Sequence, residues 1–162
     1  MREIIVDPSP RLHRVCSDIK VVDAQIRELA ADMLKLIHYK AGPGSVTSNL
    51  RTMGLSAPQV GECVKLFIVD TEARSLVAIN PVVFKVFGEH QWVEGCLSLP
   101  GQFYMVRRPK LIKFRYLDIH GEPHTEQAHD DYAGVFQHEI DHLSGIMISQ
   151  SGSFVSKGSI FR

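Results

Sequence analysis

Residues 130–143 of the chain read Asp-Asp-Tyr-Ala-Gly-Val-Phe-Gln-His-Glu-Ile-Asp-His-Leu. An α-helix is predicted here, because Asp130 or Asp131 can cap its start and Gly145 follows just beyond its end. Apolar residues recur along the stretch at the spacing of one helix face. The face that we expect to be buried comprises Ala133 or Gly134, Phe136, Ile140 and Leu143.

The same helix carries His138, Glu139 and His142 in the pattern His-Glu-x-x-His. Residues four apart on an α-helix lie about 40° apart around its axis, so both imidazoles can reach one metal ion. Glu139, next to the first histidine, can then take a proton from a metal-bound water. Two surface histidines on a charged helix face are the alternative interpretation.

A catalytic metal site needs three protein ligands and one open position. Thermolysin-like proteases take the third ligand from a downstream glutamate, but residues 143–162 contain no Asp, Glu, Cys or further His. The metzincin pattern needs a histidine where Ile148 stands. The third ligand must therefore come from upstream, and Cys96 is the best-placed candidate because a thiolate is a strong ligand.

Upstream of this helix, the pattern predicts one more helix and several strands. Apolar residues in 23–39 recur at three- and four-residue steps after a capping Asp23, which indicates an amphipathic helix. Runs rich in β-formers follow at residues 65–70, 75–86 and 111–119, and they are typical of largely antiparallel sheets. An α+β domain is therefore expected.

Length, charge and cysteine usage exclude several classes of protein. A chain of 162 residues suits a single domain, residues 1–162, and is too short for two of typical size. Basic and acidic residues both number 18, so no net charge attracts nucleic acid or an anionic membrane. We find neither an export signal nor an apolar run near the ~20 residues of a membrane span.

The chain has three cysteines and no Cys-x-x-Cys pattern, which favours a reducing, cytoplasmic compartment over a disulfide framework. Cys16 and Cys63 are expected to be small core or half-buried thiols.

Three motifs resemble those of the peptide deformylase family. Residues 94–98, Glu-Gly-Cys-Leu-Ser, and 137–143, Gln-His-Glu-Ile-Asp-His-Leu, match its second and third motifs without a change. Residues 52–59, Thr-Met-Gly-Leu-Ser-Ala-Pro-Gln, are similar to its first motif, with Thr52 and Ser56 in place of a glycine and an alanine. The resemblance covers roughly residues 4–148.

The resemblance implies antiparallel sheets packed around a central metal-binding helix, with an N-terminal amphipathic helix. Its implied metal ligands are Cys96, His138 and His142, and Glu139 is the implied general base and later acid. Gln59 and the backbone N–H of Leu97 would face the oxygen of a formyl group. The implied metal in the cell is iron(II), with nickel, cobalt or zinc possible as isolated, and the ligand set alone fits zinc equally well.

The implied activity is metal-dependent removal of the formyl group from N-formylmethionyl nascent peptides, with release of formate. By resemblance, the peptide would add as a strand between backbone near Gly54 and backbone at Gly95. The pocket for the first side chain of the peptide would be lined by Met53, Trp92, Val135 and part of the His138 ring. Plain core packing is the alternative interpretation of Met53 and Trp92.

Some features depart from the family pattern or leave alternatives open. Phe103 stands where many bacterial members carry a substrate-contacting arginine, and residues 41–52 are predicted to be a loop insertion. Residues 149–162 are predicted to be a loose tail, with at most residues 145–149 as a short strand. Without a basic docking helix, only transient ribosome proximity is expected. Arg108 and Asp141 either orient the metal ligands or form a simple ion pair.

Two other functions stay open on the sequence alone. A non-catalytic member of the family would bind formylated N-termini without cleaving them. A structural zinc site in an interaction module would need a fourth protein ligand such as Cys63.

Overall fold

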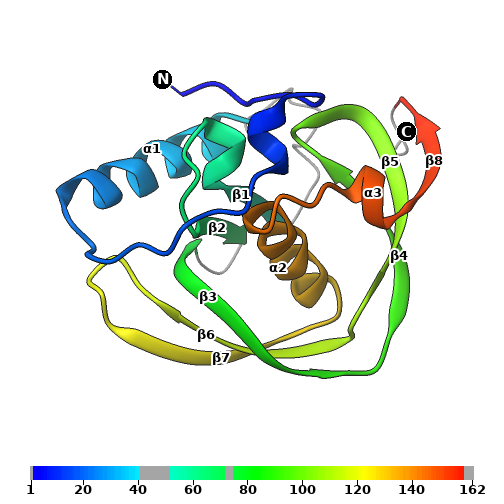
Figure 1. Cartoon of the computed structure of the whole chain (residues 1–162). Coiled ribbons are helices and arrows are strands. Elements are labelled where there is room, and N and C mark those ends of the chain that lie inside the picture. Colours follow the sequence, from blue (N-terminus) through cyan, green and yellow to red (C-terminus); the bar gives the residue numbers. More distant parts are fainter. Residues whose placement is uncertain (1, 41–51, 72–74, 159–162) are drawn as a thin grey trace.

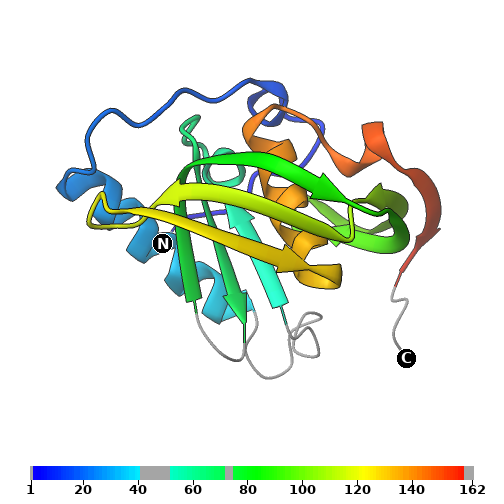
Figure 2. The same cartoon turned by 90° about the horizontal axis from the view of Figure 1, so that it is seen from below.

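Helix α2 (Asp130–Leu143) lies in the middle of the molecule, with strands on several sides of it (Figures 1 and 2). The computed structural model describes residues 2–40, 52–71 and 75–158. Within them, α2 contacts strands of both sheets. The predicted α+β architecture, with antiparallel sheets around a central helix, is confirmed.

The strands form two antiparallel sheets. The larger has the order β1-β2-β3-β6-β7, and the smaller the order β4-β5-β8. Strand β2 pairs with both β1 and β3, whereas β1 and β4 each lie at an edge of their sheet. The strands are β1 (Thr52–Ser56), β2 (Leu66–Thr71), β3 (Ser75–Phe87), β4 (His90–Cys96), β5 (Leu99–Arg108), β6 (Leu111–Leu117), β7 (Pro123–His129) and β8 (Ser153–Lys157).

Strand β2 is buried on both faces, which explains its unbroken apolar run. Leu66 and Ile68 join the core cluster of helix α1 (Ala24–Lys40), while Phe67 and Val69 join that of α2. Alternate side chains of a strand point to opposite faces, so one strand can serve both helices. The two helices therefore cover opposite faces of this part of the larger sheet.

Helix α1 begins as predicted. The backbone N–H of Ile26 donates to Oδ1 of Asp23 at 3.0 Å, so Asp23 caps the helix. No helix within the described ranges combines the length and apolar character needed to cross a membrane.

Helix α2 has the predicted bounds, and Ala133, Phe136 and Leu143 are buried as predicted, but the N-cap and the rest of the buried face differ from the prediction. The helix begins at Asp130, and the capping residue is His129, which makes no side-chain cap bond, so the N-cap prediction was wrong. Ile140 is only half-buried, whereas His138 and Glu139 are buried. The physical reason is that strands of both sheets pack on α2, so its buried surface is wider than a single amphipathic stripe.

The tail is more regular than a loose segment. Residues 145–149 form no strand; helix α3 (Ile148–Ser151) begins there, and β8 then pairs with β5. The Phe154 and Tyr104 rings meet edge-on at 5.6 Å. Backbone pairing with β5 holds β8, and such pairing leaves little trace in a Ser- and Gly-rich sequence. Residues 159–162 and, apart from Thr52 in β1, the predicted insertion at 41–52 lie outside the described residues.

Candidate active site

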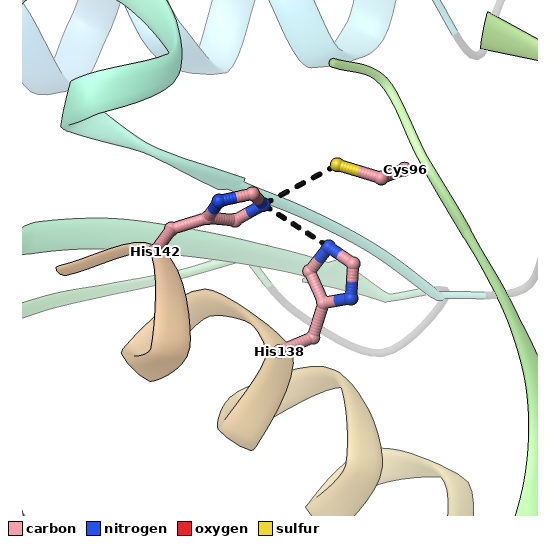
Figure 3. Close-up of side chains that lie close together, drawn as sticks. All are labelled: Cys96, His138 and His142. Atoms are coloured by element: carbon pink, nitrogen blue, oxygen red, sulfur yellow. Dashed lines mark hydrogen bonds between the residues drawn. The ribbon is translucent and has the colours of Figure 1, made fainter. Parts of the chain in front are cut away.

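Three side chains meet between the end of β4 and helix α2: Cys96, His138 and His142 (Figure 3). Nε2 of His142 lies 3.2 Å from Nε2 of His138 and 3.3 Å from Sγ of Cys96. The ligand atoms of this cluster all lie within 4.8 Å of one another. The described residues contain no second group of this kind.

These spacings fit one tetrahedral metal ion. With metal–nitrogen bonds of about 2.0–2.1 Å and a metal–sulfur bond of about 2.3 Å, tetrahedral geometry separates two nitrogens by about 3.3 Å and nitrogen from sulfur by about 3.6 Å. Imidazole and thiolate ligands suit zinc, iron and neighbouring transition metals. Since three side chains converge, a fourth position is left for water or substrate, as in catalytic sites.

Cys63 is not part of this cluster. Its Sγ lies 3.2 Å from Sγ of Cys16 instead. The structural zinc site with Cys63 as fourth ligand is therefore contradicted.

Glu94 fixes the orientation of His138. Nδ1 of His138 donates to Oε2 of Glu94 at 2.8 Å, which leaves Nε2 free for a metal. Arg108 donates to both oxygens of the same carboxylate, at 2.7 and 3.0 Å, and Nε1 of Trp92 donates at 2.7 Å. Burial opposes ionisation, yet the hydrogen bonds from His138 and Arg108 lower the pKa of Glu94 to about 2. Glu94 is therefore a buried anion at neutral pH.

Arg108 also reaches helix α2, where its Nη1 donates to Oδ2 of Asp141 at 2.6 Å. The Arg108–Asp141 contact is an ion pair, and it is continuous through Glu94 with His138, a candidate metal ligand. The sequence left two alternatives for Arg108 and Asp141, an ion pair or a role in orienting the ligands. Both describe part of the same network.

Glu139 is 2% exposed, and its Oε2 has no hydrogen-bond partner within the described residues. Burial raises the pKa of Glu139 to about 7. Gly54 on β1 faces this carboxylate, and a Cβ atom there would stand 2.2 Å from Oε1 of Glu139. Gly54 is thus required for the space that the Glu139 side chain occupies.

Gln59, in the short helix η2 (Ala57–Val60), is 1% exposed and has a fixed amide orientation. Its Oε1 accepts bonds from the backbone N–H of Ser56 at 2.9 Å and from its hydroxyl at 3.0 Å. The amide nitrogen therefore faces Ser98 Oγ at 3.2 Å and Cys96 Sγ at 3.5 Å. An N–H donor stands beside the ligand cluster.

The other residues expected at the site lie on β1, β4 and α2 or directly after Cys96. Trp92 packs on α2 so closely that a Cβ at Gly134 would stand 2.2 Å from its ring. Gly95 lies opposite Phe103 in the β4–β5 pair. Val135 is half-buried on α2, and Leu97 is half-buried just after Cys96. Met53 pairs with Asp70 in the β1–β2 ladder, and its side chain lies outside the described residues.

Sequence reasoning did not assign a role to Glu94 or Ser56. The position of Glu94 two residues before Cys96 is a usable signal, because residues two apart on a strand share a face. A signal also exists for Ser56, because residues 56–59, Ser-Ala-Pro-Gln, have the Ser-x-x-Gln pattern of a capping box, in which the glutamine side chain bonds the backbone of the serine.

Comparison with known proteins agrees with the motifs. The family model described as polypeptide deformylase matches residues 1–156. The chain belongs to the peptide deformylase family. Among curated deformylases, that of Dictyoglomus thermophilum is 36% identical over 148 residues, covering 91% of this chain and 90% of the relative. That of Chlorobaculum parvum is 42% identical over 145 residues, covering 85% and 72%.

Solved deformylase structures share the fold. The Thermotoga maritima enzyme matches with a TM-score of 0.84 at 30% identity, over 93% of this chain and 97% of that one. The Thermus thermophilus enzyme matches with a TM-score of 0.81 at 34% identity, over 91% and 83%. Family membership makes this chain an enzyme of the deformylase class.

Proposed function

We propose that this deformylase uses one divalent metal to hydrolyse the formyl group of N-formylmethionyl nascent peptides, releasing formate. The observation that carries the proposal is the position of Glu139, a buried carboxylate with an unpaired oxygen beside three converging ligands. A carboxylate with a pKa raised to about 7 is suited to accept and return a proton at neutral pH.

In this mechanism Cys96, His138 and His142 hold the metal, with iron(II) proposed for the cell and zinc, nickel or cobalt as isolated substitutes. A metal held by these residues would supply Lewis-acid polarisation of the formyl carbonyl and would lower the pKa of the attacking water. Glu139 takes a proton from that water as the new C–O bond forms. It then donates the proton to the amine nitrogen as the C–N bond breaks, leaving formate and a free N-terminus.

Two N–H groups are proposed to stabilise the carbonyl oxygen as negative charge develops on it. One is the amide of Gln59, which its bonds to Ser56 hold with the nitrogen facing the cluster. The other is the backbone N–H of Leu97. Loss of one such donor typically lowers the rate by about 10²- to 10³-fold.

The proposed substrate is an extended peptide that adds a strand between β1 and β4. Its support is that both strands lie at an edge of their sheet, where backbone groups can pair with a ligand. Backbone near Met53 and Gly54 and at Gly95 would make these bonds. The methionine pocket proposed beside them is lined by Met53, Trp92, Val135 and His138. Nascent chains in the cytoplasm, with transient ribosome proximity, are the proposed setting.

The test is formate release from a formyl-Met tripeptide by protein loaded anaerobically with iron(II). Glu139→Gln should lower the rate of release by about 10²- to 10⁴-fold and keep the metal, whereas Cys96→Ala should lose both activity and metal. An acetyl-Met tripeptide serves as the substrate control. Peptide binding without formate, with iron, nickel and cobalt in turn, would instead establish the non-catalytic binder.

A further inference from the structure

Two cysteines outside the metal cluster lie side by side. The Sγ atoms of Cys16 and Cys63 are 3.2 Å apart, although the residues are separated by 47 positions in the chain. Cys16 is 4% exposed, and Cys63 is half-buried. Neither sulfur belongs to the proposed metal site.

Backbone pairing holds the two segments in register. Ser17 and Val64 form a parallel bridge, with Ser17 N–H donating to the Cys63 carbonyl at 3.1 Å and Lys65 N–H to the Ser17 carbonyl at 2.9 Å. Cys16 and Cys63 precede the bridged residues and are therefore neighbours across it. Paired segments lie about 4.7–4.9 Å apart, within the Cα separations of about 4.4–6.8 Å found in disulfides. The spacing of the two segments is therefore compatible with a Cys16–Cys63 disulfide.

A basic pocket opens at Cys63. It has a volume of about 150 Å³ and is lined by Arg11, Arg14, Pro58, Gly61 and Cys63. Both arginines are exposed, and neither forms an ion pair with any other described residue. Two guanidinium groups beside a thiol favour an approaching anion, above all a carboxylate.

We propose that Cys63 and Cys16 form a thiol–disulfide exchange site for disulfides of small anionic thiols, with Arg11 and Arg14 binding a carboxylate of the incoming molecule. In the first step, the Cys63 thiolate attacks one sulfur of the small disulfide. The small S–S bond breaks, a mixed disulfide forms on Cys63, and the first small thiolate leaves.

In the second step, Cys16 attacks Sγ of Cys63 and releases the second small thiolate. The protons of the two protein thiols end on the two released thiols. The protein dithiol is thereby oxidised, and the small disulfide is reduced to two thiols.

Burial decides the order of attack. Cys63 lines the pocket, whereas burial and the neighbouring Cys63 raise the pKa of Cys16 to about 12. Cys16 therefore keeps its proton until the mixed disulfide is in place beside it.

The resulting bridge would tie together two segments that support the proposed active site. The Cys16 N–H donates to the Leu143 carbonyl at 2.9 Å, one residue after His142. Cys63 follows the short helix η2, which carries Gln59. A cross-link between them restricts the unfolded chain, so the oxidised protein should have the higher Tm. The exchange site itself does not depend on the deformylase reaction.

The test treats the metal-loaded protein with oxidised glutathione and maps disulfides under non-reducing conditions by mass spectrometry. We expect a Cys16–Cys63 bridge. Cys16→Ser should stop at a stable glutathione adduct on Cys63, whereas Cys63→Ser should leave Cys16 unmodified. Circular dichroism and metal content verify the fold of each variant, and Cys16→Ala serves as a second resolving-thiol variant.

The proposed role of the two arginines in binding a carboxylate is tested separately. Arg11→Gln combined with Arg14→Gln should slow the reaction with oxidised glutathione by about tenfold at low salt. The same variant should react unchanged with the neutral 2-hydroxyethyl disulfide, and Arg107→Gln, an exposed arginine paired with Glu89, is the matched control. Modification confined to Cys96, unchanged reactivity of Cys63→Ser, or equal slowing with both reagents would overturn the proposal.

Discussion

Oε2 of Glu94 accepts a hydrogen bond from Nδ1 of His138 at 2.8 Å, so a residue of β4 sets which histidine nitrogen faces the proposed metal. Arg108 and Trp92 also donate hydrogen bonds to this carboxylate. The ligand orientation thus depends on a buried anion that is not itself a ligand.

Replacing Glu94 should weaken metal binding. In Glu94→Gln the neutral amide is a weaker acceptor for His138 and leaves the buried Arg108 guanidinium with Asp141 but without the Glu94 carboxylate, so we expect metal affinity to fall by about 10- to 100-fold. Competition with a chromophoric chelator measures this. Glu89→Gln, which removes an exposed carboxylate paired with Arg107, is the control. Equal affinity in both variants would contradict the role of Glu94.

Glu139→Gln should separate chemistry from metal binding. The amide keeps the shape of the side chain but cannot accept the proton of the attacking water, so kcat should fall by about 10²- to 10⁴-fold. Metal content, measured on the same samples, should stay at the wild-type level. A variant that retains wild-type turnover would exclude Glu139 as the base.

The rate should depend on pH through Glu139. Burial raises the pKa of this carboxyl to about 7, and the ionised form is the one that acts as base. We therefore expect kcat/KM to be level above pH ~7 and to fall about tenfold per unit below it. Formate release measured at constant metal occupancy gives the profile. Activity that stays level down to pH ~5 would show that the base has an ordinary carboxyl pKa.

Gly54→Ala should displace the Glu139 carboxylate, because the new Cβ would stand 2.2 Å from its Oε1. A displacement of about 1 Å at a catalytic group can cost about 10²-fold in rate, and we expect a loss of that size. The control compares the destabilisation by Gly54→Ala in two proteins. In the Glu139→Ala variant, Gly54→Ala should lower the free energy of unfolding in urea much less than in the wild type. Equal costs in both backgrounds would place the clash elsewhere.

Gly134→Ala should destabilise the fold, because the Cβ of the new alanine would stand 2.2 Å from the ring of Trp92. Overpacking of this kind typically lowers the free energy of unfolding by about 1–3 kcal/mol. Adding Trp92→Leu should recover part of the loss, as measured by urea unfolding. Because the chain has one tryptophan, its fluorescence reports the displacement in the single variant directly.

The sequence predicted best those features that depend on contacts between residues close together in the chain. The His138–His142 pair and the Asp23 cap follow from helix geometry, which relates residues three or four apart. Strand β2 could be predicted from its unbroken apolar run, which reflects the burial of Leu66–Val69 in the structure. Polar β7, an edge strand, and β8 were not predicted, since backbone pairing with β6 and β5 makes them strands.

Residue identity and spacing along the chain were thus sufficient to predict a metal-binding helix, a candidate thiolate ligand and the family. Packing between distant segments decided the rest. It brings Glu94 to His138 across 44 positions, places Gly54 against Glu139, and directs Cys63 to Cys16 instead of the metal cluster. The physical reason is that helix geometry constrains only residues within a turn or two, whereas contacts between separate strands and helices depend on how the sheets close around α2.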